Sequence, residues 1–165
     1  MSAGALRLGV VADSHGFLCE AARRALAGSD LILHAGDIGG RDVLAELGAI
    51  APVLAVAGNG DPDLAHELPL EQRVELLGCR ILLCHWYDNF GRIHPKIARD
   101  LEEFRPHVLV YGHTHAARNE QRGDCLHFNP GYAGPPGPGR PRSLGRLRVA
   151  AGHVAGEIVP LGDAG

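Results

Sequence analysis

Five short apolar runs in this chain each lead directly to a polar side chain of a type that binds metal ions. Runs this short, bounded by turn-forming residues, are typical of buried strands rather than of helices. They cover Leu8–Ala12, Leu31–Ala35, Val53–Ala57, Arg80–Cys84 and His107–Tyr111. A ligand at the end of a buried strand lies at the rim of a sheet, so the five ends together predict a preformed metal site.

The side chains at these ends carry only carboxylate, amide and imidazole groups. In chain order they are Asp13, His15, Asp37, Asn59, His85, His113 and His115. Such donors suit manganese, iron, zinc, nickel or cobalt better than a metal that prefers thiolates. Seven ligands exceed the four of one tetrahedral site. They fit two adjacent ions that share a carboxylate, roughly 3.5–4 Å apart as in two-metal hydrolases, with Asp37 as the natural bridge.

The charges of such a site favour an anionic substrate. Two divalent ions bring about four positive charges, and Asp13 and Asp37 remove about two, because Asn59 and neutral histidines remove none. A site that stays positive attracts a phosphate ester and stabilises its developing charge. The formal net charge of the whole chain, -3, gives no electrostatic reason to expect a long nucleic acid or a membrane surface as partner.

The first half of the chain alternates between expected strands and helices. We expect strands at about Leu6–Ala12, Leu31–Ala35 and Val53–Ala57, and helices at about Leu18–Ala27 and Arg41–Leu47. This βαβαβ order predicts a parallel sheet, with ligands bound beyond the carboxyl ends of its strands. The first candidate ligands all fall at those ends.

The second half changes character. Strands at Arg73–Leu77 and Arg80–Cys84 flank a hairpin signal at Gly78, and a helix is expected at about Pro95–Phe104. Further strands follow at Val108–Tyr111, Ala117–Gln121, Cys125–Asn129, Leu144–Val149 and Val154–Val159, with a surface loop at Gly131–Arg142. The pattern predicts one domain over residues 1–165, of α/β or α+β type, arranged as an αββα sandwich.

Composition favours a cytoplasmic protein. The apolar run Leu8–Ala12 ends directly in Asp13, so we expect no secretory leader, and no run reaches the roughly 20 apolar residues of a membrane helix. The four cysteines form no C-x-x-C pair, and we interpret them as reduced thiols.

The order of the motifs resembles that of the calcineurin-like metallophosphoesterases. The motifs are D-x-H at Asp13, G-D at Asp37, G-N-x-D at Asn59, the single His85, and G-H-x-H ending at His115. The likeness is strongest to the small bacterial and archaeal phosphodiesterase branch and spans Asp13 to about Ser143. Asn129-Pro130-Gly131 and the later Arg140–Ser143 also resemble that branch, although Tyr132 stands where serine is usual.

The resemblance implies a metallophosphoesterase fold, a four-layer αββα sandwich of mixed sheets, and a dinuclear site. One ion is held by Asp13, His15, Asp37 and His115, and the other by Asp37, Asn59, His85 and His113. A metal-bridging hydroxide then attacks the phosphorus of a phosphate diester in line. We expect Asp37, Asn59 and His113 to be catalytic and Gly60, Arg140 and Arg142 to bind the substrate. Manganese is the first expectation for the metal, with iron, nickel, zinc or cobalt as alternatives.

Two positions depart from the better-known phosphatases of the family. Gly60 stands where they carry a histidine that acts as general acid, and Gly40 stands where they carry the carboxylate that orients it. General acid help is typically worth about 10²–10⁴-fold. We therefore expect slow turnover of esters with poor leaving groups. The open space at Gly60 also favours a diester, because it admits a second substituent on phosphorus.

Alternative functions and several neighbouring residues stay open at this stage. A phosphomonoesterase or nucleotidase of the same fold is one alternative. Another is a metal-binding scaffold, as in a retromer subunit of this fold, although this chain keeps every ligand. A homo-oligomer is also open. His34 is expected to be a buried support, and Asp61 either orients a ligand histidine or caps the segment that follows it. The remaining open positions are His94 as a substitute proton donor, and Trp86 and Tyr87 as a pocket wall or subunit contact.

Overall fold

The computed structural model describes residues 4–162, and its first sheet contains the predicted βαβαβ unit. The strand order is β12-β11-β1-β2-β3. β1, β2 and β3 run parallel, while β11 and β12 add to the other edge in antiparallel fashion. The bounds are β1 Leu6–Val11, β2 Leu31–His34, β3 Val53–Ala55, β11 Ser143–Ala150 and β12 His153–Pro160.

The second sheet comes from the middle of the chain. Its strand order is β4-β5-β8-β10-β9, with β5, β8 and β10 parallel in the centre and an antiparallel strand at each edge. The bounds are β4 Glu71–Leu76, β5 Cys79–Cys84, β8 Val108–Val110, β9 Arg118–Arg122 and β10 Cys125–Asn129. Both sheets are therefore mixed, as predicted.

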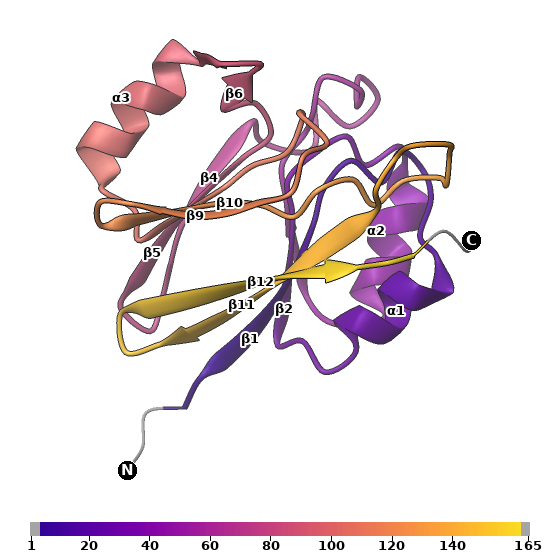
Figure 1. Cartoon of the computed structure of the whole chain (residues 1–165), viewed down its shortest axis with the longest axis horizontal. Coiled ribbons are helices and arrows are strands. Elements are labelled where there is room, and N and C mark those ends of the chain that lie inside the picture. The colour runs from indigo at the N-terminus through magenta and orange to yellow at the C-terminus, as the bar shows by residue number, and fades with distance from the viewer. Residues whose placement is uncertain (1–3, 163–165) are drawn as a thin grey trace.

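Helices cover the outer faces of the two sheets (Figure 1). α1 (Glu20–Leu26) and α2 (Arg41–Gly48) lie on the first sheet, and their buried residues share a core with Val11 and Ile32. α3 (Pro95–Phe104) lies on the second sheet and packs against Leu82 and Leu109. The four-layer αββα sandwich is thus confirmed.

Alternation along the strands builds the cores on both sides of each sheet. In β5, Ile81 and Leu83 face the first sheet, while Leu82 and Cys84 face α3. Successive side chains of a strand point to opposite faces, so a strand that is apolar throughout is stable only when both faces are covered. Cys84 is buried on the α3 side, and this burial raises the pKa of its thiol.

A small two-stranded hairpin was not predicted. β6 (Asp88–Asn89) pairs with β7 (Arg92–Ile93) across Phe90 and Gly91, whose φ angles are 52° and 93°. Two positive φ values fit the tight turns that join hairpin strands. Two-residue strands are too short for any periodicity to reveal.

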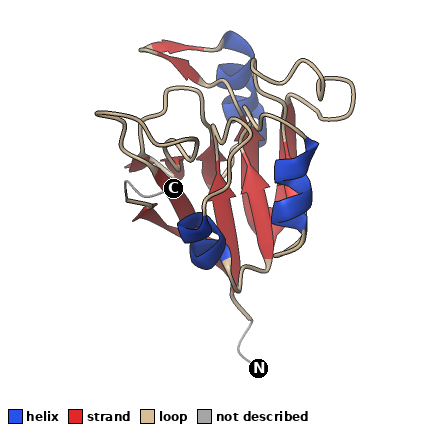
Figure 2. Ribbon diagram, turned by 90° about the vertical axis from the view of Figure 1, so that its right-hand side faces the viewer, coloured by secondary structure: helices blue, strands red, loops and turns tan. Residues whose placement is uncertain are grey.

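The carboxyl ends of the parallel strands meet at one end of the sandwich. Figure 2 shows long loops gathered there, beyond the strand arrows. β3 and β8 end earlier than predicted, at Ala55 and Val110, because the chain turns toward the rim before the apolar run is complete. Within residues 4–162 no helix is long and apolar enough to cross a membrane.

Candidate metal centre

The seven predicted ligands lie together at this loop end. His15 Nε2 is 3.8 Å from Asp37 Oδ2, His85 Nε2 is 3.4 Å from Asp37 Oδ1, and His115 Nε2 is 3.5 Å from Asp13 Oδ1. Asn59 Oδ1 lies 3.0 Å from His85 Nε2 and 3.1 Å from His113 Nδ1. One ligand atom from each of Asp13, Asp37 and His85 falls within a common 4.8 Å, and the same holds for Asp13, His15 and His115.

The hydrogen bonds of His85 leave a space that fits a cation. Its Nδ1 donates to Ala35 O at 2.7 Å, so in the neutral ring Nε2 presents a lone pair. That lone pair faces two oxygen acceptors, Asn59 Oδ1 and Asp37 Oδ1. Converging acceptors repel one another unless a proton or a cation lies between them. This donor set therefore fits a metal ion.

A carboxylate oxygen on the other side of the cluster is also left without a hydrogen bond. Asp13 is fully buried, and its Oδ2 accepts from the His113 backbone N–H at 3.1 Å. Its Oδ1 is buried and has no hydrogen-bond partner among the described residues. Buried charges are costly unless they are paired or coordinate a metal, so Asp13 Oδ1 also fits a cation site.

Backbone strain is concentrated at the cluster. Five of the seven side chains belong to residues with left-handed φ angles, at 52° for Asp13, 46° for His15, 53° for Asp37, 74° for His113 and 59° for His115. Such conformations cost of order 1–3 kcal/mol each in residues other than glycine, and they gather at functional sites. Here they turn the chain back just after each strand and aim the side chains at one point.

Asp61 holds two of the ligand loops together. Its carboxylate accepts the backbone N–H groups of Ile38 at 3.1 Å, Gly39 at 3.0 Å and Gly58 at 2.9 Å. Burial alone raises the pKa of Asp61, but the three backbone hydrogen bonds outweigh it, and the pKa falls below its ordinary value. Asp61 therefore fills neither predicted role, because the backbone N–H groups that it binds all precede it in the chain and none belongs to a ligand histidine.

His34 supports the cluster from beneath, as expected. Its Nδ1 accepts from Gly36 N at 3.1 Å, so its Nε2 donates to Ser14 Oγ at 2.8 Å, and Ser14 in turn donates to Ile38 O. Complete burial is the main reason that the pKa of His34 falls to about 3. A permanently neutral His34 holds the loops of Asp13 and Asp37 at a fixed spacing.

Two glycines let the backbone touch Asp37. A Cβ atom at Gly58 would lie 2.2 Å from Asp37 Oδ1, and one at Gly60 would lie 3.0 Å from it. The Gly60 N–H donates to the same oxygen at 2.7 Å. Gly60 therefore supports the central carboxylate as well as leaving space, a role that the sequence did not reveal.

Tyr132 and Arg140 flank the exposed side of the cluster. The Tyr132 ring lies 4.8 Å from the His115 ring and 5.9 Å from the His15 ring, measured between centroids. Arg140 Nη1 donates to the Tyr132 hydroxyl at 3.0 Å, and its guanidinium carbon lies 4.8 Å from the ring centroid. Arg140 is exposed, which leaves the rest of its guanidinium accessible beside these histidines.

Arg142 lies elsewhere. It is buried, and its Nε donates to Gly134 O at 2.8 Å while its Nη1 donates to Gly162 O at 3.4 Å. The guanidinium carbon is 5.5 Å from the Phe17 ring centroid. These contacts give Arg142 a structural role in the loop before β11, in place of the predicted contact with substrate.

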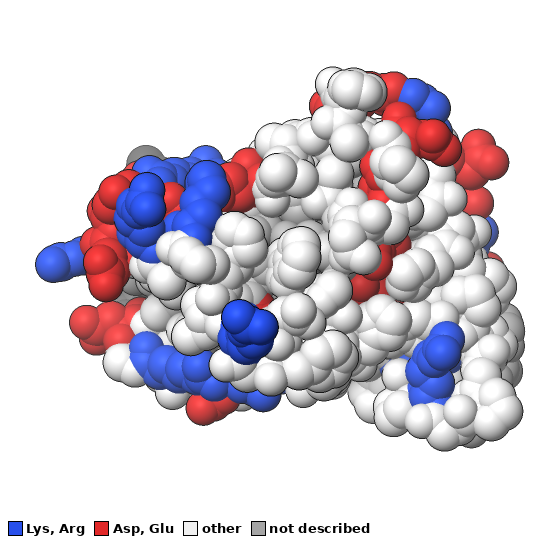
Figure 3. Space-filling model, turned by 90° about the horizontal axis from the view of Figure 1, so that it is seen from above, with Lys and Arg blue, Asp and Glu red and all other residues white. Residues whose placement is uncertain are grey.

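The two histidines of the last motif differ in their surroundings. Partial burial and the neighbouring His85 lower the pKa of His113. The Asp13 carboxylate, whose Oδ1 lies 3.5 Å from His115 Nε2, raises the pKa of His115, although the burial of the ring and the charge of Arg140 oppose the shift. The face of the molecule seen in Figure 3 consists mainly of side chains other than Lys, Arg, Asp and Glu, with acidic atoms visible in its recesses.

Trp86 lies beside the cluster, and Tyr87 does not. The Trp86 ring is 5.3 Å from the His113 ring and 5.9 Å from the His94 ring, and the residue is 43% exposed. Tyr87 is buried against Tyr111, with ring centroids 5.0 Å apart. Trp86 is therefore a wall residue of the site, and Tyr87 is part of the core.

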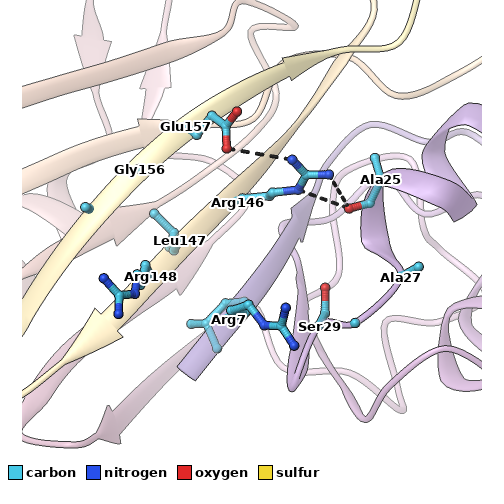
Figure 4. Close-up of a pocket in the computed structure, with 12 residues that line it drawn as sticks. Arg7, Ala25, Ala27, Ser29, Arg146, Leu147, Arg148, Gly156 and Glu157 are labelled. Atoms are coloured by element: carbon cyan, nitrogen blue, oxygen red, sulfur yellow. Dashed lines mark hydrogen bonds and ion pairs between the residues drawn. The ribbon is translucent and has the colours of Figure 1, made fainter. Parts of the chain in front are cut away.

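Another pocket, of about 470 Å³, lies between β1, β11, β12 and the end of α1, and it shares no residue with the cluster. Figure 4 shows Arg146 bridging across it. Arg146 Nε and Nη2 donate to Ala25 O at 3.1 and 3.0 Å, and Nη1 lies 3.7 Å from Glu157 Oε2. These bonds tie β11 to the end of α1.

The curated relatives differ in how much of their length this chain matches. A probable metallophosphoesterase of Methanothermobacter thermautotrophicus is 32% identical over 167 aligned positions, which cover 94% of this chain and 92% of the relative. Phosphodiesterase YfcE of Escherichia coli strain K12 is 41% identical over 101 positions, covering 58% of this chain and 52% of YfcE.

Solved structures share the fold at lower identity. A predicted phosphoesterase from Streptococcus pneumoniae superposes with a TM-score of 0.72 at 23% identity, covering 96% of this chain and 91% of the other. Vacuolar Protein Sorting 29 from Cryptosporidium parvum superposes with a TM-score of 0.75 at 20% identity, covering 94% and 97%. The family model of the calcineurin-like phosphoesterase superfamily domain matches residues 6–152. By sequence, by fold and by the order of its site residues, this chain belongs to the calcineurin-like phosphoesterase superfamily.

Proposed function

We propose that this protein is a phosphodiesterase that uses two divalent metal ions. The observation that carries the proposal is the convergence of acceptor atoms at the carboxyl ends of the parallel strands. His85 Nε2 lies 3.0 Å from Asn59 Oδ1 and 3.4 Å from Asp37 Oδ1, and the buried Asp13 Oδ1 has no hydrogen-bond partner within residues 4–162. Arrangements of this kind are stable when cations bind. Because the chain belongs to a phosphoesterase superfamily, we infer that such cations serve the hydrolysis of phosphate esters.

Asp37 is the residue best placed to bridge two ions. Its Oδ1 lies 3.4 Å from His85 Nε2, while its Oδ2 lies 3.8 Å from His15 Nε2. We assign Asp37, Asn59, His85 and His113 to one ion, and Asp13, His15, Asp37 and His115 to the other. Manganese remains our first choice for both, followed by iron, nickel, zinc or cobalt.

Two bound divalent ions supply positive charge for a phosphate group and lower the pKa of water, which yields a nucleophile at neutral pH. Residues of the chain position the metal ligands and contact the substrate. Gly60 N–H and the loops tied by Asp61 hold Asp37 in place. Arg140, anchored on Tyr132, extends beside His115 toward solvent and is placed to donate to a phosphate oxygen.

Position 60 carries no proton donor for the leaving oxygen, because it is glycine. We therefore expect turnover to depend steeply on the pKa of the leaving alcohol. A series of aryl phosphodiesters with leaving groups of increasing pKa measures this dependence. A shallow slope of log kcat would show that another group protonates the leaving oxygen and would remove this part of the proposal.

The decisive assay uses the protein reconstituted with manganese, zinc, nickel or iron(II) and offered bis(p-nitrophenyl) phosphate and p-nitrophenyl phosphate. We expect the diester to be hydrolysed faster than the monoester. Asp37→Asn abolishes activity, whereas Asp63→Asn, an exposed aspartate in the loop after Asn59, keeps it. Full activity in Asp37→Asn contradicts the two-metal mechanism, and faster monoester hydrolysis favours a phosphomonoesterase.

A scaffold role makes the opposite prediction for metal content. The similarity to Vacuolar Protein Sorting 29 is 20% identity and extends only to the fold. A protein that neither contains nor acquires manganese, iron, nickel or zinc on incubation would favour a scaffold over an enzyme.

We also propose a cytoplasmic location. All four cysteines are free thiols in the structure, and burial raises the pKa of Cys79, Cys84 and Cys125. Unpaired thiols of this kind suit a reducing compartment.

A further inference from the structure

An apolar pocket opens directly off the proposed metal centre. Its volume is about 330 Å³, and two of its lining residues, Asn59 and His85, are members of the ligand cluster. Leu70, Trp86 and Ile97 provide apolar wall, and His94 closes one side. The sequence left Trp86 open between a pocket wall and a subunit contact, and the structure places it in this wall.

Two of the three apolar wall residues are exposed to solvent, whereas Ile97 is buried. Leu70 is 73% exposed and Trp86 is 43% exposed. Phe90 and Ile93, 83% and 49% exposed, lie in the β6–β7 hairpin that follows Trp86 in the chain, and they line a separate pocket. Large exposed apolar side chains that gather next to a polar site are typical of ligand-binding surfaces.

The charged residues at the pocket are already paired. Lys96 Nζ lies 2.6 Å from Glu71 Oε1 and 2.9 Å from Asp100 Oδ2. These two carboxylates raise the pKa of Lys96 and balance its charge. The pocket therefore offers no free cation for a phosphate of its own, and what it favours is an uncharged, apolar group.

The position of the pocket relative to the ligands determines which part of a diester it meets. In an in-line displacement the attacking and leaving oxygens lie on opposite sides of phosphorus, and the retained substituent lies to the side. The pocket shares ligand residues with the cluster, so it flanks the phosphate position rather than lying opposite the metal-binding side chains. A substituent entering it is the retained one.

We propose that this pocket binds the retained ester substituent of the substrate, and that this substituent is aromatic or similarly flat and apolar. The inference rests on the proposed phosphodiesterase function and specifies its substrate class. Trp86 and Leu70 are the residues that set this preference.

Trp86 is the only tryptophan in the chain, so its fluorescence reports on the pocket without any turnover. The protein is loaded with zinc and titrated with diphenyl phosphate or dimethyl phosphate. We expect a saturable change in emission with diphenyl phosphate and at least about tenfold weaker binding of dimethyl phosphate, from the burial of a ring in an apolar pocket. Equal affinities, or no change in emission with either probe, would overturn the proposal.

Kinetics with a constant leaving group then tests the preference. Phenyl p-nitrophenyl phosphate and methyl p-nitrophenyl phosphate release the same nitrophenolate and differ only in the retained group. We expect kcat/KM to favour the phenyl ester by about tenfold, and Leu70→Ser to reduce that ratio to about two or three. Leu77→Ser is the matched control, because Leu77 is 42% exposed at the other end of β4.

The outcomes separate the two proposals. Hydrolysis of both esters with equal kcat/KM, or a ratio unchanged by Leu70→Ser, contradicts the pocket assignment and leaves the phosphodiesterase intact. Hydrolysis of neither ester with any metal contradicts the phosphodiesterase, and the Trp86 titration then decides the pocket alone.

Discussion

The two halves of the metal centre are built differently. The His85 half consists of Asn59, His85 and His113 with Asp37 Oδ1, and the His85 side chain is 3% exposed with contacts of 3.0–3.4 Å. The His15 half consists of His15 and His115 with Asp13 Oδ1 and Asp37 Oδ2. Its histidines are 37% exposed, and the corresponding contacts are 3.5 and 3.8 Å.

The difference implies unequal metal affinities. The His85 half is fixed by the hydrogen bond from His85 to Ala35 O before any ion arrives, so little ordering remains to be done on binding. The two histidines of the His15 half are 37% exposed, and the ring of Tyr132 lies beside both of them. We therefore expect one tightly held ion and one ion that exchanges readily.

The largest expected effect separates the halves by substitution. His85→Ala removes a buried ligand that also fixes its own orientation, so we expect activity to fall by about 10³-fold. His15→Ala removes an exposed ligand, and we expect a smaller loss, of about 10–100-fold, that excess metal partly restores. Steady-state rates at increasing metal concentration measure both. If both variants lose the same fraction of activity and excess metal restores both equally, the two halves of the metal centre do not differ in the way described.

The sequence predicted the fold and the ligand set well because both depend on patterns that repeat. Apolar runs marked the strands, and α3 and β10 were predicted with the bounds that the structure has. The seven side chains were found because each follows such a run. The four-layer arrangement followed from the order of strands and helices, together with the family resemblance.

What the sequence did not predict depends on which groups are buried and on how single residues bend. Nothing in the loop composition distinguishes Arg140, which is exposed on Tyr132, from Arg142, which donates to backbone carbonyls in the interior. The contact of Gly60 with Asp37 depends on loop geometry, and the pocket at Trp86 and Leu70 depends on which side chains stay exposed.

Asp61 tests whether the ligand loops depend on one buried carboxylate. Asp61→Asn loses an acceptor that backbone N–H groups require, and we expect unfolding to become easier by about 1–3 kcal/mol. The lowered folded-state pKa means that Asp61 stabilises the fold above its unfolded pKa of about 3.9, and that this contribution is lost as the pH falls through the folded value. Urea unfolding between pH 7 and pH 3 measures both effects.

Asp61→Asn should lose less stability than the wild type at the acid end of the range from pH 7 to pH 3, because it no longer has the titrating carboxylate. Asp63→Asn, an exposed neighbour, is the control and should retain the wild-type profile. Parallel profiles for wild type and Asp61→Asn would mean that the backbone hydrogen bonds of Asp61 do not stabilise the loops.

Arg140 tests whether the exposed His15 half also contacts the substrate. Arg140→Ala removes a charged donor anchored on Tyr132, and we expect KM for a diester to rise by about tenfold with little change in kcat. Arg148→Ala, an exposed arginine on β11 in the separate pocket of Figure 4, is the control and should leave KM unchanged. An unchanged KM in Arg140→Ala would remove Arg140 from substrate binding.

Gly60→Ala is expected to have the smallest effect. A Cβ atom there lies 3.0 Å from Asp37 Oδ1, so the carboxylate must shift by a few tenths of an ångström. Such a shift weakens the bridge without removing it, and we expect activity to fall by only about three- to tenfold. An undiminished rate would indicate that the position of Asp37 is less constrained than the contact implies.

The most direct test of the account is a count of bound ions during stepwise chelation. The protein, loaded with manganese or zinc, is dialysed against increasing concentrations of a chelator, and the metal remaining per chain is measured by mass spectrometry. We predict two ions that leave in two separated steps, with the tighter step absent in His85→Ala and the weaker step absent in His15→Ala. A single ion per chain, or two ions released together in the wild type and in both variants, would contradict a two-metal site with unequal halves.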